Sequence, residues 1–309
     1  MSLLSLVSKN GPSGFGYATT AEAVTEGLDL TGRHVLITGS NSGLGLEAAR
    51  VLIKRGATVI GTARTVDKAR EALAPLGGKT IPIALELGEP DSVRPSVAAV
   101  RALGVPLDAL IANAGIMALP KLEKLHGYEK QFFTNHVGHF IFVTGLLSQL
   151  ADNGRVVILS SGAHKNAPAA GIELDNLSGD SNYSAWKNYG QSKLANLLFA
   201  RELARRFAGT SKVANAVHPG VIATNLGRHM STMERMGVLA AGPLFLKSVG
   251  EGAATEVWAA VHPAAALISG QYLQDCNVAD SSSLGKDMAL AAKLWTATEE
   301  IVAKVGSGG

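Results

Sequence analysis

The sequence predicts a single doubly wound α/β domain, in which helices cover both faces of a parallel sheet. Short runs rich in Val, Ile and Leu alternate along the chain with longer segments of helical period. The short runs are apolar throughout, which is typical of parallel strands buried on both faces. Neither a linker nor an internal repeat interrupts this alternation, so we expect the 309 residues to form one such domain.

The elements follow a leader of about 30 residues. In this leader, Thr19 and Glu22 predict a capping box at the start of one short helix. The domain is expected to span residues 31–305. Its predicted strands are 34–38, 57–63, 80–85, 107–112, 155–160 and 212–218. Helices fall between these strands, for example at 44–55, 90–103 and 193–208.

Composition and charge exclude several classes of protein. Hydrophobic residues make up 47% and charged residues 17%, which is typical of a folded chain. The 28 basic and 25 acidic residues give a net charge of +3 without a basic run, so nucleic-acid binding has no compositional support. The single cysteine, Cys276, excludes an internal disulfide and a multi-cysteine metal site. Because we find neither a signal peptide nor an apolar run of about 18 residues, we expect a cytoplasmic protein without a membrane span.

The first predicted strand ends in a glycine-rich turn that runs directly into a helix. Glycines let the backbone approach a pyrophosphate closely, and the helix N-terminus offers free N–H groups and a favourable dipole. A turn in this context, near the start of the fold, predicts a Rossmann-type dinucleotide site. The residues expected to contact the cofactor, which follow Thr38, are Gly39, Ser40, Asn41, Ser42, Gly43, Leu44 and Gly45.

The end of the second predicted strand indicates which dinucleotide is preferred. NAD-binding folds usually carry an acidic residue there, which binds the ribose 2′-hydroxyl. This chain has Ala63 followed by Arg64. Without a carboxylate to repel it, a 2′-phosphate can form a charge-assisted contact with the Arg64 guanidinium. We therefore expect NADP(H) to be preferred over NAD(H); the alternative is that Arg64 is a solvated surface arginine.

Further motifs follow in a fixed order, and together they are specific. They are Asn113-Ala114-Gly115, Asn135-His136-Val137-Gly138-His139-Phe140, Ser160-Ser161-Gly162-Ala163-His164, Tyr189-Gly190-Gln191-Ser192-Lys193-Leu194-Ala195-Asn196, His218-Pro219-Gly220 with Thr224, and Ser269-Gly270-Gln271-Tyr272 with Asp275-Cys276. In this order the chain resembles the short-chain dehydrogenase/reductase superfamily, and within it the retinol-dehydrogenase-like branch, over residues of about 31–283.

The chemistry of an alcohol–carbonyl conversion requires an acid/base. A hydride joins or leaves a carbon only if a proton joins or leaves its oxygen. Tyr189 and Lys193 are four residues apart, on one face of a predicted helix, and a nearby ammonium lowers the pKa of a tyrosine. We assign the acid/base to Tyr189. The resemblance implies that Lys193 also holds the nicotinamide ribose and that Ser161 hydrogen-bonds the substrate oxygen. It also implies that Asn135 supports a water beside Lys193.

The same spacing occurs a second time, in Tyr183 and Lys187. Tyr183 follows the segment Ser178-Gly179-Asp180-Ser181-Asn182, which disfavours a helix. The residues from Ser192 onward, in contrast, predict a long helix with an apolar face. The signature of the family also falls on residues 189–196, so Tyr189 is preferred over Tyr183.

The resemblance implies further cofactor contacts. Asn113, Ala114 and Gly115 would run beside the adenosine ribose. Thr224 would reach the carboxamide or a phosphate, with Ile222 contributing backbone after Pro219 and Gly220. At Glu86 and Leu87 the chain departs from the family, which usually has aspartate at the adenine edge, so the contact of Glu86 is open. The long interval between Ser161 and Tyr189, with Asp175-Asn176-Leu177, is similar to an insertion in the retinol-dehydrogenase-like branch.

The predicted substrate site is mostly apolar. It would include Met117 and His164, although local packing is an alternative for His164. The segment of about 225–250 is rich in Met and Leu, and it is either a peripheral helical pair or a lid over an apolar substrate. His136 and His139 could share a helical face as metal ligands, but no carboxylate or cysteine cluster joins them, so we expect no metal.

These features predict an NADP(H)-dependent oxidoreductase that interconverts an alcohol and a ketone or aldehyde on a small, largely apolar substrate. One alternative is reduction of a carbon–carbon double bond, as in protochlorophyllide reductases, which rely on additional cysteines. The other is a non-catalytic dinucleotide-binding protein, a class that usually loses the tyrosine or lysine. Relatives often form dimers or tetramers, so a homodimer or homotetramer is also expected.

Overall fold

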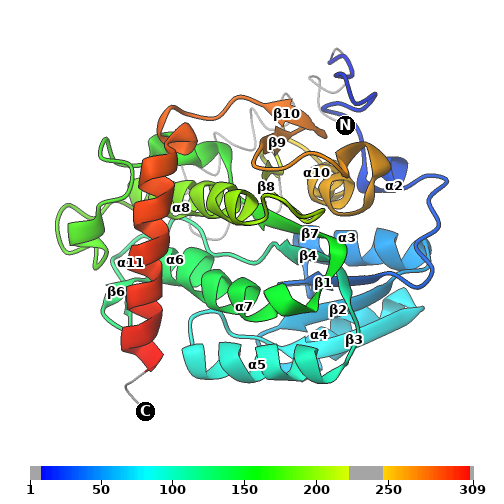
Figure 1. Ribbon diagram of the computed structural model, residues 1–309, viewed down its shortest axis with the longest axis horizontal. Coiled ribbons are helices and arrows are strands. Elements are labelled where there is room, and N and C mark those ends of the chain that lie inside the picture. Colours follow the sequence, from blue (N-terminus) through cyan, green and yellow to red (C-terminus); the bar gives the residue numbers. More distant parts are fainter. Residues whose placement is uncertain (1–7, 223–245, 307–309) are drawn as a thin grey trace.

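The computed structural model describes residues 8–222 and 246–306. Its main sheet has eight strands in the order β10-β9-β8-β7-β4-β1-β2-β3 (Figure 1). The strands are β1 (His34–Ile37), β2 (Thr58–Ala63), β3 (Lys79–Ala84), β4 (Leu107–Ala112), β7 (Leu150–Leu159), β8 (Val213–His218), β9 (Tyr272–Gln274) and β10 (Asn277–Ala279). Within this sheet every neighbouring pair of strands is parallel except the pair of β9 and the short β10, which is antiparallel.

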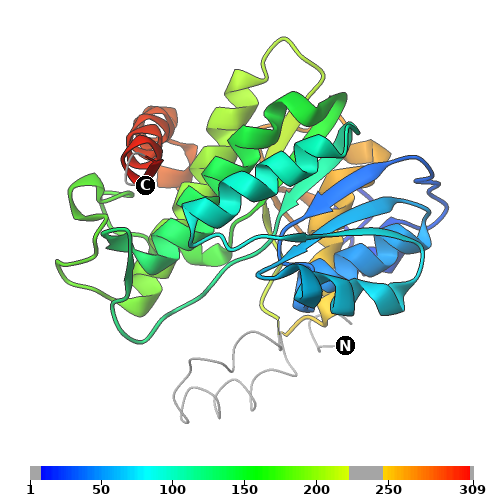
Figure 2. The same cartoon turned by 90° about the horizontal axis from the view of Figure 1, so that it is seen from below.

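Two layers of helices enclose this sheet (Figure 2). One layer consists of α3 (Gly43–Lys54), α4 (Val66–Leu73) and α10 (Val249–Val261). The other consists of α5 (Pro90–Ala102), α7 (Gly138–Leu146) and α8 (Ala185–Arg206), with α11 (Met288–Gly306) packed outside α8. The predicted doubly wound α/β domain is confirmed.

The strands form because their side chains are buried on both faces. Leu36 belongs to the apolar cluster on the side of α8, whereas its neighbours Val35 and Ile37 belong to the cluster on the side of α3. All three side chains are fully buried. Successive side chains of a strand point to opposite faces, so such a strand must be apolar throughout.

Most of the predicted boundaries agree with the structure to within one residue. Two elements begin earlier than predicted: β7 at Leu150 and α8 at Ala185. The minor elements are the hairpin of β5 (Lys124–Leu125) and β6 (Tyr128–Glu129), α6 (Lys130–Phe132), the π-helical turn η2 (Phe133–Val137), and the short 3₁₀ turns η1 (Ala74–Leu76), η3 (Leu147–Gln149), η4 (Gly162–Asn166), η5 (Leu174–Asn176), η6 (Pro263–Ala265) and η7 (Leu284–Lys286). Within the described ranges, no helix combines the length and the apolar character needed to cross a bilayer.

The leader contains the predicted short helix, α2 (Ala21–Val24), but a different threonine caps it. The hydroxyl of Thr20 accepts a hydrogen bond from the N–H group three residues further on (3.2 Å). The hydroxyl of Thr19 instead accepts from the N–H group three residues earlier (2.8 Å). The predicted capping box of Thr19 and Glu22 is therefore wrong, and the carboxylate of Glu22 has other partners.

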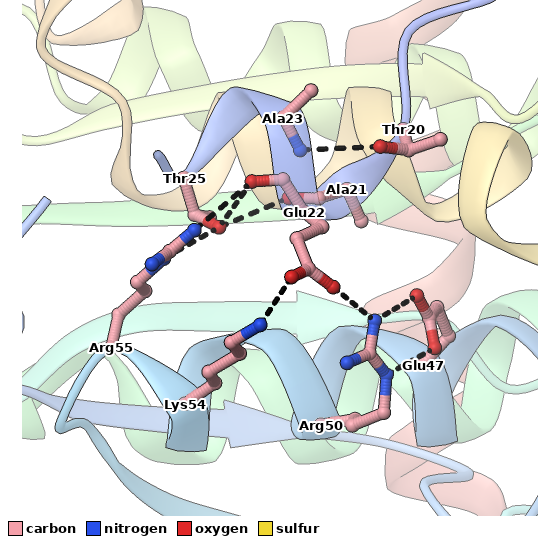
Figure 3. Close-up of polar contacts among 9 residues, drawn as sticks. All are labelled: Thr20, Ala21, Glu22, Ala23, Thr25, Glu47, Arg50, Lys54 and Arg55. Atoms are coloured by element: carbon pink, nitrogen blue, oxygen red, sulfur yellow. Dashed lines mark hydrogen bonds and ion pairs between the residues drawn. The ribbon is translucent and has the colours of Figure 1, made fainter. Parts of the chain in front are cut away.

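Those partners lie on α3 (Figure 3). Glu22 forms ion pairs with Arg50 (3.0 Å) and with Lys54. The Lys54 and Arg50 contacts hold the pKa of Glu22 at about 2. Arg55, which follows α3, donates a hydrogen bond to the hydroxyl of Thr25 (3.2 Å). The leader is thus attached to the outer surface of the helix that carries the glycine turn at its other end.

The strand order reverses between β1 and β4. In doubly wound sheets, ligands bind in the crevice at the carboxyl ends of the strands on either side of such a reversal. The glycine turn follows β1, and the Asn113 motif follows β4. The fold therefore brings both predicted cofactor motifs to one crevice.

Candidate active site

The glycine turn is packed tightly against the ends of both central strands. A methyl group on Gly45 would lie 2.5 Å from the carbonyl oxygen of Gly39 and 2.6 Å from Nδ2 of Asn113. Asn113 donates a hydrogen bond from Nδ2 to the carbonyl of Thr38 (2.9 Å). Only glycine at position 45 permits this approach, which sets the N-terminus of α3 at the crevice.

The side chains of the turn divide into buried and exposed groups. Ser40 is buried and donates a hydrogen bond to the carbonyl of Thr62 on β2 (3.3 Å), and Leu44 is also buried. Asn41 and Ser42 are exposed. Ser42 precedes α3 without forming a side-chain cap, so its hydroxyl does not compete with a ligand for the first N–H groups of the helix. This arrangement fits a pyrophosphate.

Arg64 and Glu86 follow two neighbouring strands on the same edge of the sheet. Arg64 is exposed directly after β2, whose end is joined to the glycine turn by the bond from the N–H of Ser40 to the carbonyl of Thr62 (2.9 Å). The carboxylate of Glu86 accepts a hydrogen bond from the N–H of Gly88 (3.3 Å). It is folded towards its own backbone, so an adenine contact by Glu86 stays a prediction.

Tyr189 and Lys193 lie on α8, as predicted, with Lys193 Nζ 5.7 Å from the centre of the Tyr189 ring. Ser161 begins the turn η4 after β7, and its side chain is hydrogen-bonded to Tyr189. Lys193 Nζ also donates to the carbonyl of Leu159 (3.1 Å). The structure therefore brings the three predicted catalytic side chains together.

Burial dominates the proton affinities of this cluster. It raises the pKa of Tyr189 to about 12, and the hydrogen bond from Ser161 opposes it only in part. Burial also lowers the pKa of Lys193 to about 8. We expected the ammonium of Lys193 to lower the pKa of Tyr189, but desolvation is the larger effect here. The phenol of Tyr189 is thus protonated at neutral pH, in the form that can donate a proton.

Asn135 lies in the π-helical turn η2, which leads into α7. Its Oδ1 accepts a hydrogen bond from the N–H of Ile116 (2.8 Å), and its Nδ2 donates to the carbonyl of Ile116 (2.9 Å) and to Ser192 Oγ (3.0 Å). A methyl group on Gly115 would lie 3.1 Å from Asn135 Oδ1 and 3.5 Å from Lys193 Nζ. Asn135 and Lys193 therefore meet at Gly115, and a water supported by Asn135 stays a prediction.

The competing pair, Tyr183 and Lys187, has other partners. Tyr183 precedes α8 and donates its hydroxyl to the carbonyl of Leu119 (2.7 Å). Lys187 forms an ion pair with Glu173 (3.0 Å). The two side chains therefore tie separate loops to α8, which favours Tyr189 as the acid/base.

His164 has no polar ring atom left for a substrate. Its Nδ1 donates to the carbonyl of Ser161 (2.7 Å), and its Nε2 accepts from the N–H of Ser282 (3.1 Å). This geometry favours the local packing role over the substrate contact. Met117 is half-buried in the loop after β4, one residue beyond the backbone that Asn135 holds.

Trp186 adjoins the acid/base and was missed by the sequence reasoning. It is 38% exposed and lies one helical turn before Tyr189, with the two ring centres 6.1 Å apart and the rings nearly perpendicular. Lys193 lies one turn after Tyr189 on the same helix. The spacing of three residues was the available signal.

Pro219, Gly220 and Ile222 follow β8. Pro219 and Gly220 are half-buried, and Ile222 is buried. Thr224 lies outside the described residues, and so does most of the predicted lid at 225–250. At the described end of that segment, residues 248–250 form the cap and first turn of α10, and the lid stays a prediction.

Lys247 is a second side chain that the sequence did not identify. It is 1% exposed, forms an ion pair with Asp275 (2.5 Å), and lies 4.6 Å from the ring centre of Tyr17. Its methylene chain packs against Gly220, where a methyl group would lie 2.7 Å from Lys247 Cδ. Lys247 thus packs against the backbone that follows β8.

The remaining candidates have structural surroundings. His136 contacts the hydroxyl of Thr298, whereas His139 contacts that of Thr38. Across residues 8–222 and 246–306, no group of three or more His, Cys, Asp or Glu side chains is arranged to hold a metal ion. Cys276 is buried, which raises the pKa of its thiol to about 12.

Comparison with known proteins identifies the family. The family model described as short chain dehydrogenase matches residues 33–235. Short-chain dehydrogenase TIC 32 B, chloroplastic, from Brassica napus is 41% identical over 96% of this chain and 97% of its own length. Retinol dehydrogenase 14 from Homo sapiens is 36% identical over 88% of this chain and 86% of its own.

A solved structure has the same fold. An uncharacterized protein from Mycobacterium paratuberculosis is 34% identical, with a TM-score of 0.74, over 91% of this chain and 97% of that one. The chain therefore belongs to the short-chain dehydrogenase family of oxidoreductases and is similar to the retinol dehydrogenases among them.

Proposed function

We propose that the protein is an NADP(H)-dependent oxidoreductase that interconverts an alcohol and a ketone or aldehyde, with Tyr189 as the acid/base. The observation that carries the proposal is the cluster of the Tyr189 phenol, the Ser161 hydroxyl and the Lys193 ammonium beside the cofactor crevice. The two halves of the reaction, proton transfer and dinucleotide binding, thus have their groups side by side.

The chain's own residues account for the proton and the charge. The nicotinamide supplies the hydride when it is bound. Ser161 donates a hydrogen bond to the substrate oxygen, and Tyr189 transfers its phenolic proton to that oxygen as the carbon is reduced. In this proposal Lys193, whose pKa is about 8, returns a proton to the resulting phenolate. The high pKa of Tyr189 suits the reductive direction.

The cofactor preference rests on Arg64. It is an exposed cation after β2, and Ala63 before it carries no carboxylate that would repel a 2′-phosphate. Asn41 and Ser42 in the neighbouring turn are also exposed and add hydrogen-bonding groups.

The substrate is small and largely apolar. Trp186 presents a partly exposed ring next to Tyr189, and Met117 lies in the loop after β4. Both side chains favour an apolar carbonyl compound over a charged metabolite. Reduction of a carbon–carbon double bond and non-catalytic dinucleotide binding are less well supported, because the only thiol is buried and the four catalytic residues are all present.

Titration with NADPH and with NADH tests the cofactor. We expect NADPH to bind at least about tenfold more tightly, which corresponds to about 1.4 kcal/mol, and Arg64→Ala to remove most of this difference. Arg70→Ala is a matched control, because Arg70 is exposed on α4 and pairs with Asp67. Equal binding of NADH by the unchanged protein would overturn the NADP(H) preference.

Turnover tests the reaction class. A panel of aldehydes and ketones, followed by the loss of NADPH absorbance, should include compounds that are reduced. Binding of NADPH without turnover of any carbonyl compound or alcohol would favour the non-catalytic alternative. A cytoplasmic location and a homodimeric or homotetrameric assembly stay predictions, and the Brassica relative is named as chloroplastic.

A further inference from the structure

Four buried polar side chains form one run of hydrogen bonds between the cofactor turn and the catalytic helix. They are Thr38 after β1, His139 on α7, Asn135 in η2 and Ser192 on α8, and each is fully buried. The run begins at the N–H of Ala114 and ends at the carbonyl of Tyr189.

The first half of the run has only one consistent set of proton positions. The N–H of Ala114 donates to Thr38 Oγ1 (3.0 Å), which lies 2.9 Å from His139 Nε2. His139 Nδ1 lies 2.9 Å from the carbonyl of Asn135, which can only accept, so Nδ1 carries the ring proton. Nε2 of a neutral ring is then an acceptor, and Thr38 donates to it.

Burial keeps His139 in this neutral form. Burial lowers the pKa of the ring to about 4. The hydrogen bond to the Asn135 carbonyl opposes this shift, whereas the charge of Lys193 adds to it. At neutral pH the ring therefore donates on one side and accepts on the other, as the run requires.

The second half of the run passes through the Asn135 side chain. The amide orientation is fixed, because Oδ1 accepts from the N–H of Ile116 (2.8 Å). Nδ2 then donates to Ser192 Oγ (3.0 Å), and Ser192 Oγ donates to the carbonyl of Tyr189 (2.8 Å). His139 thus bonds to the backbone of Asn135, and the Asn135 side chain bonds through Ser192 to the helical turn that carries Tyr189.

We propose that His139 is a positioning residue, which fixes the Asn135 and Tyr189 turns relative to the cofactor-binding backbone of Thr38 and Ala114. This role rests on the proposed function. The contact of His139 with Thr38 spans 101 positions of the chain. His139 also bonds to a π-helical turn, a feature that is frequent at functional sites. Small displacements of reacting groups lower turnover more than binding.

His136 provides a matched control. It lies one turn earlier, is buried to a similar degree, and bonds through Nε2 to the hydroxyl of Thr298 on α11 (2.9 Å). Each histidine is replaced with Phe, and we measure kcat, the KM of a carbonyl substrate, the NADPH Kd and the unfolding midpoint. We expect His139→Phe to lower kcat by about tenfold or more with little change in KM or Kd, and His136→Phe to change the midpoint alone.

Two further variants separate positioning from general destabilisation. Thr38→Val removes the hydroxyl at constant shape and should reproduce the loss, whereas Thr38→Ser retains it. The combined variant Thr38→Val with His139→Phe should have the same kcat as the slower of the two single variants, because both substitutions break the same run of hydrogen bonds. Losses that multiply, or equal kcat losses for His136→Phe and His139→Phe, would overturn the role of His139.

Hydrogen exchange gives a readout that does not need turnover. NADPH binding should slow exchange of the backbone amides around residues 189–193 in the unchanged protein and much less in His139→Phe. If exchange responds in this way but no carbonyl is reduced, the coupling stands and the proposed function fails. If the response is the same in both proteins, the coupling itself is wrong.

Discussion

Replacing Tyr189 with Phe is expected to lower kcat by about two to four orders of magnitude while leaving NADPH binding nearly unchanged. The phenylalanine ring can still pack against Trp186 and beneath Lys193. Only the phenolic proton and its hydrogen bond with Ser161 are lost. Steady-state kinetics and a fluorescence titration with NADPH check the two halves of this expectation.

Tyr183→Phe is the control for that variant. Tyr183 is the other tyrosine followed by lysine at the same spacing, and burial likewise raises its pKa to about 12. Its hydroxyl donates to the carbonyl of Leu119 and accepts from Gln131 Nε2, so we expect a small loss of stability and a kcat close to that of the unchanged protein. If Tyr183→Phe loses activity and Tyr189→Phe does not, the assignment is reversed.

Replacing Glu256 with Met is expected to stabilise the protein, and to do so increasingly as the pH rises from 5 to 8. Glu256 lies on α10 and is 1% exposed. Among the residues that the structure describes, neither of its carboxyl oxygens has a hydrogen-bond partner. Burial raises its pKa from 4.5 to about 8, so folding keeps the group neutral where the unfolded chain would ionise it.

The sign of the effect follows from this linkage. Below pH 4.5 the carboxyl is neutral in both states and costs nothing by ionisation. Between that value and about 8 the folded state binds more protons, so the free energy of unfolding falls by about 1.4 kcal/mol per pH unit. The total is on the order of 5 kcal/mol, and Met, which has no charge to desolvate, recovers it at pH 8.

Denaturant unfolding at several pH values measures this difference. Glu202→Met is the matched control: Glu202 is also 1% exposed but is paired with Arg205 and Arg206. Hydrogen bonds from Arg205 lower the pKa of Glu202, so its stabilisation is present at high pH and lost as the pH falls. Glu202→Met should therefore destabilise the protein at pH 8. A stability gain for Glu256→Met that is independent of pH would contradict the unpaired carboxyl.

The features that the sequence predicted are local ones. Tyr189 and Lys193 are set by helical spacing, and the glycine turn is set by its place between a strand and a helix, so both could be found without knowing the fold. The start of α8 was less accessible, because Asn188 and Gly190 are poor helix formers. A methyl group on Gly190 would lie 2.6 Å from the carbonyl of Ala163, so close packing against η4 maintains this first part of the helix.

The features that it missed depend on distant partners. Lys247 and Asp275 are 28 positions apart, and nothing in either neighbourhood indicates that one is the counter-ion of the other. The sequence pairs His139 with His136, because both lie in one motif, whereas its partner Thr38 lies after β1, far away in the chain. By sequence, Thr19 and Thr20 are equally suitable helix caps. The capping box predicted for Thr19 does not form, because Glu22 pairs with Arg50 and Lys54 instead.

The attachment of α2 affects where the protein can be cut. The family match begins at residue 33, yet Ala21, Val24 and Leu30 are buried in the core before it. Glu22 also balances two cations on α3, the helix whose opposite end forms the cofactor turn. A truncation placed at the edge of the family resemblance would keep every catalytic residue but uncover one side of that helix. The shortest chain that contains the chemistry is therefore shorter than the chain that supports it.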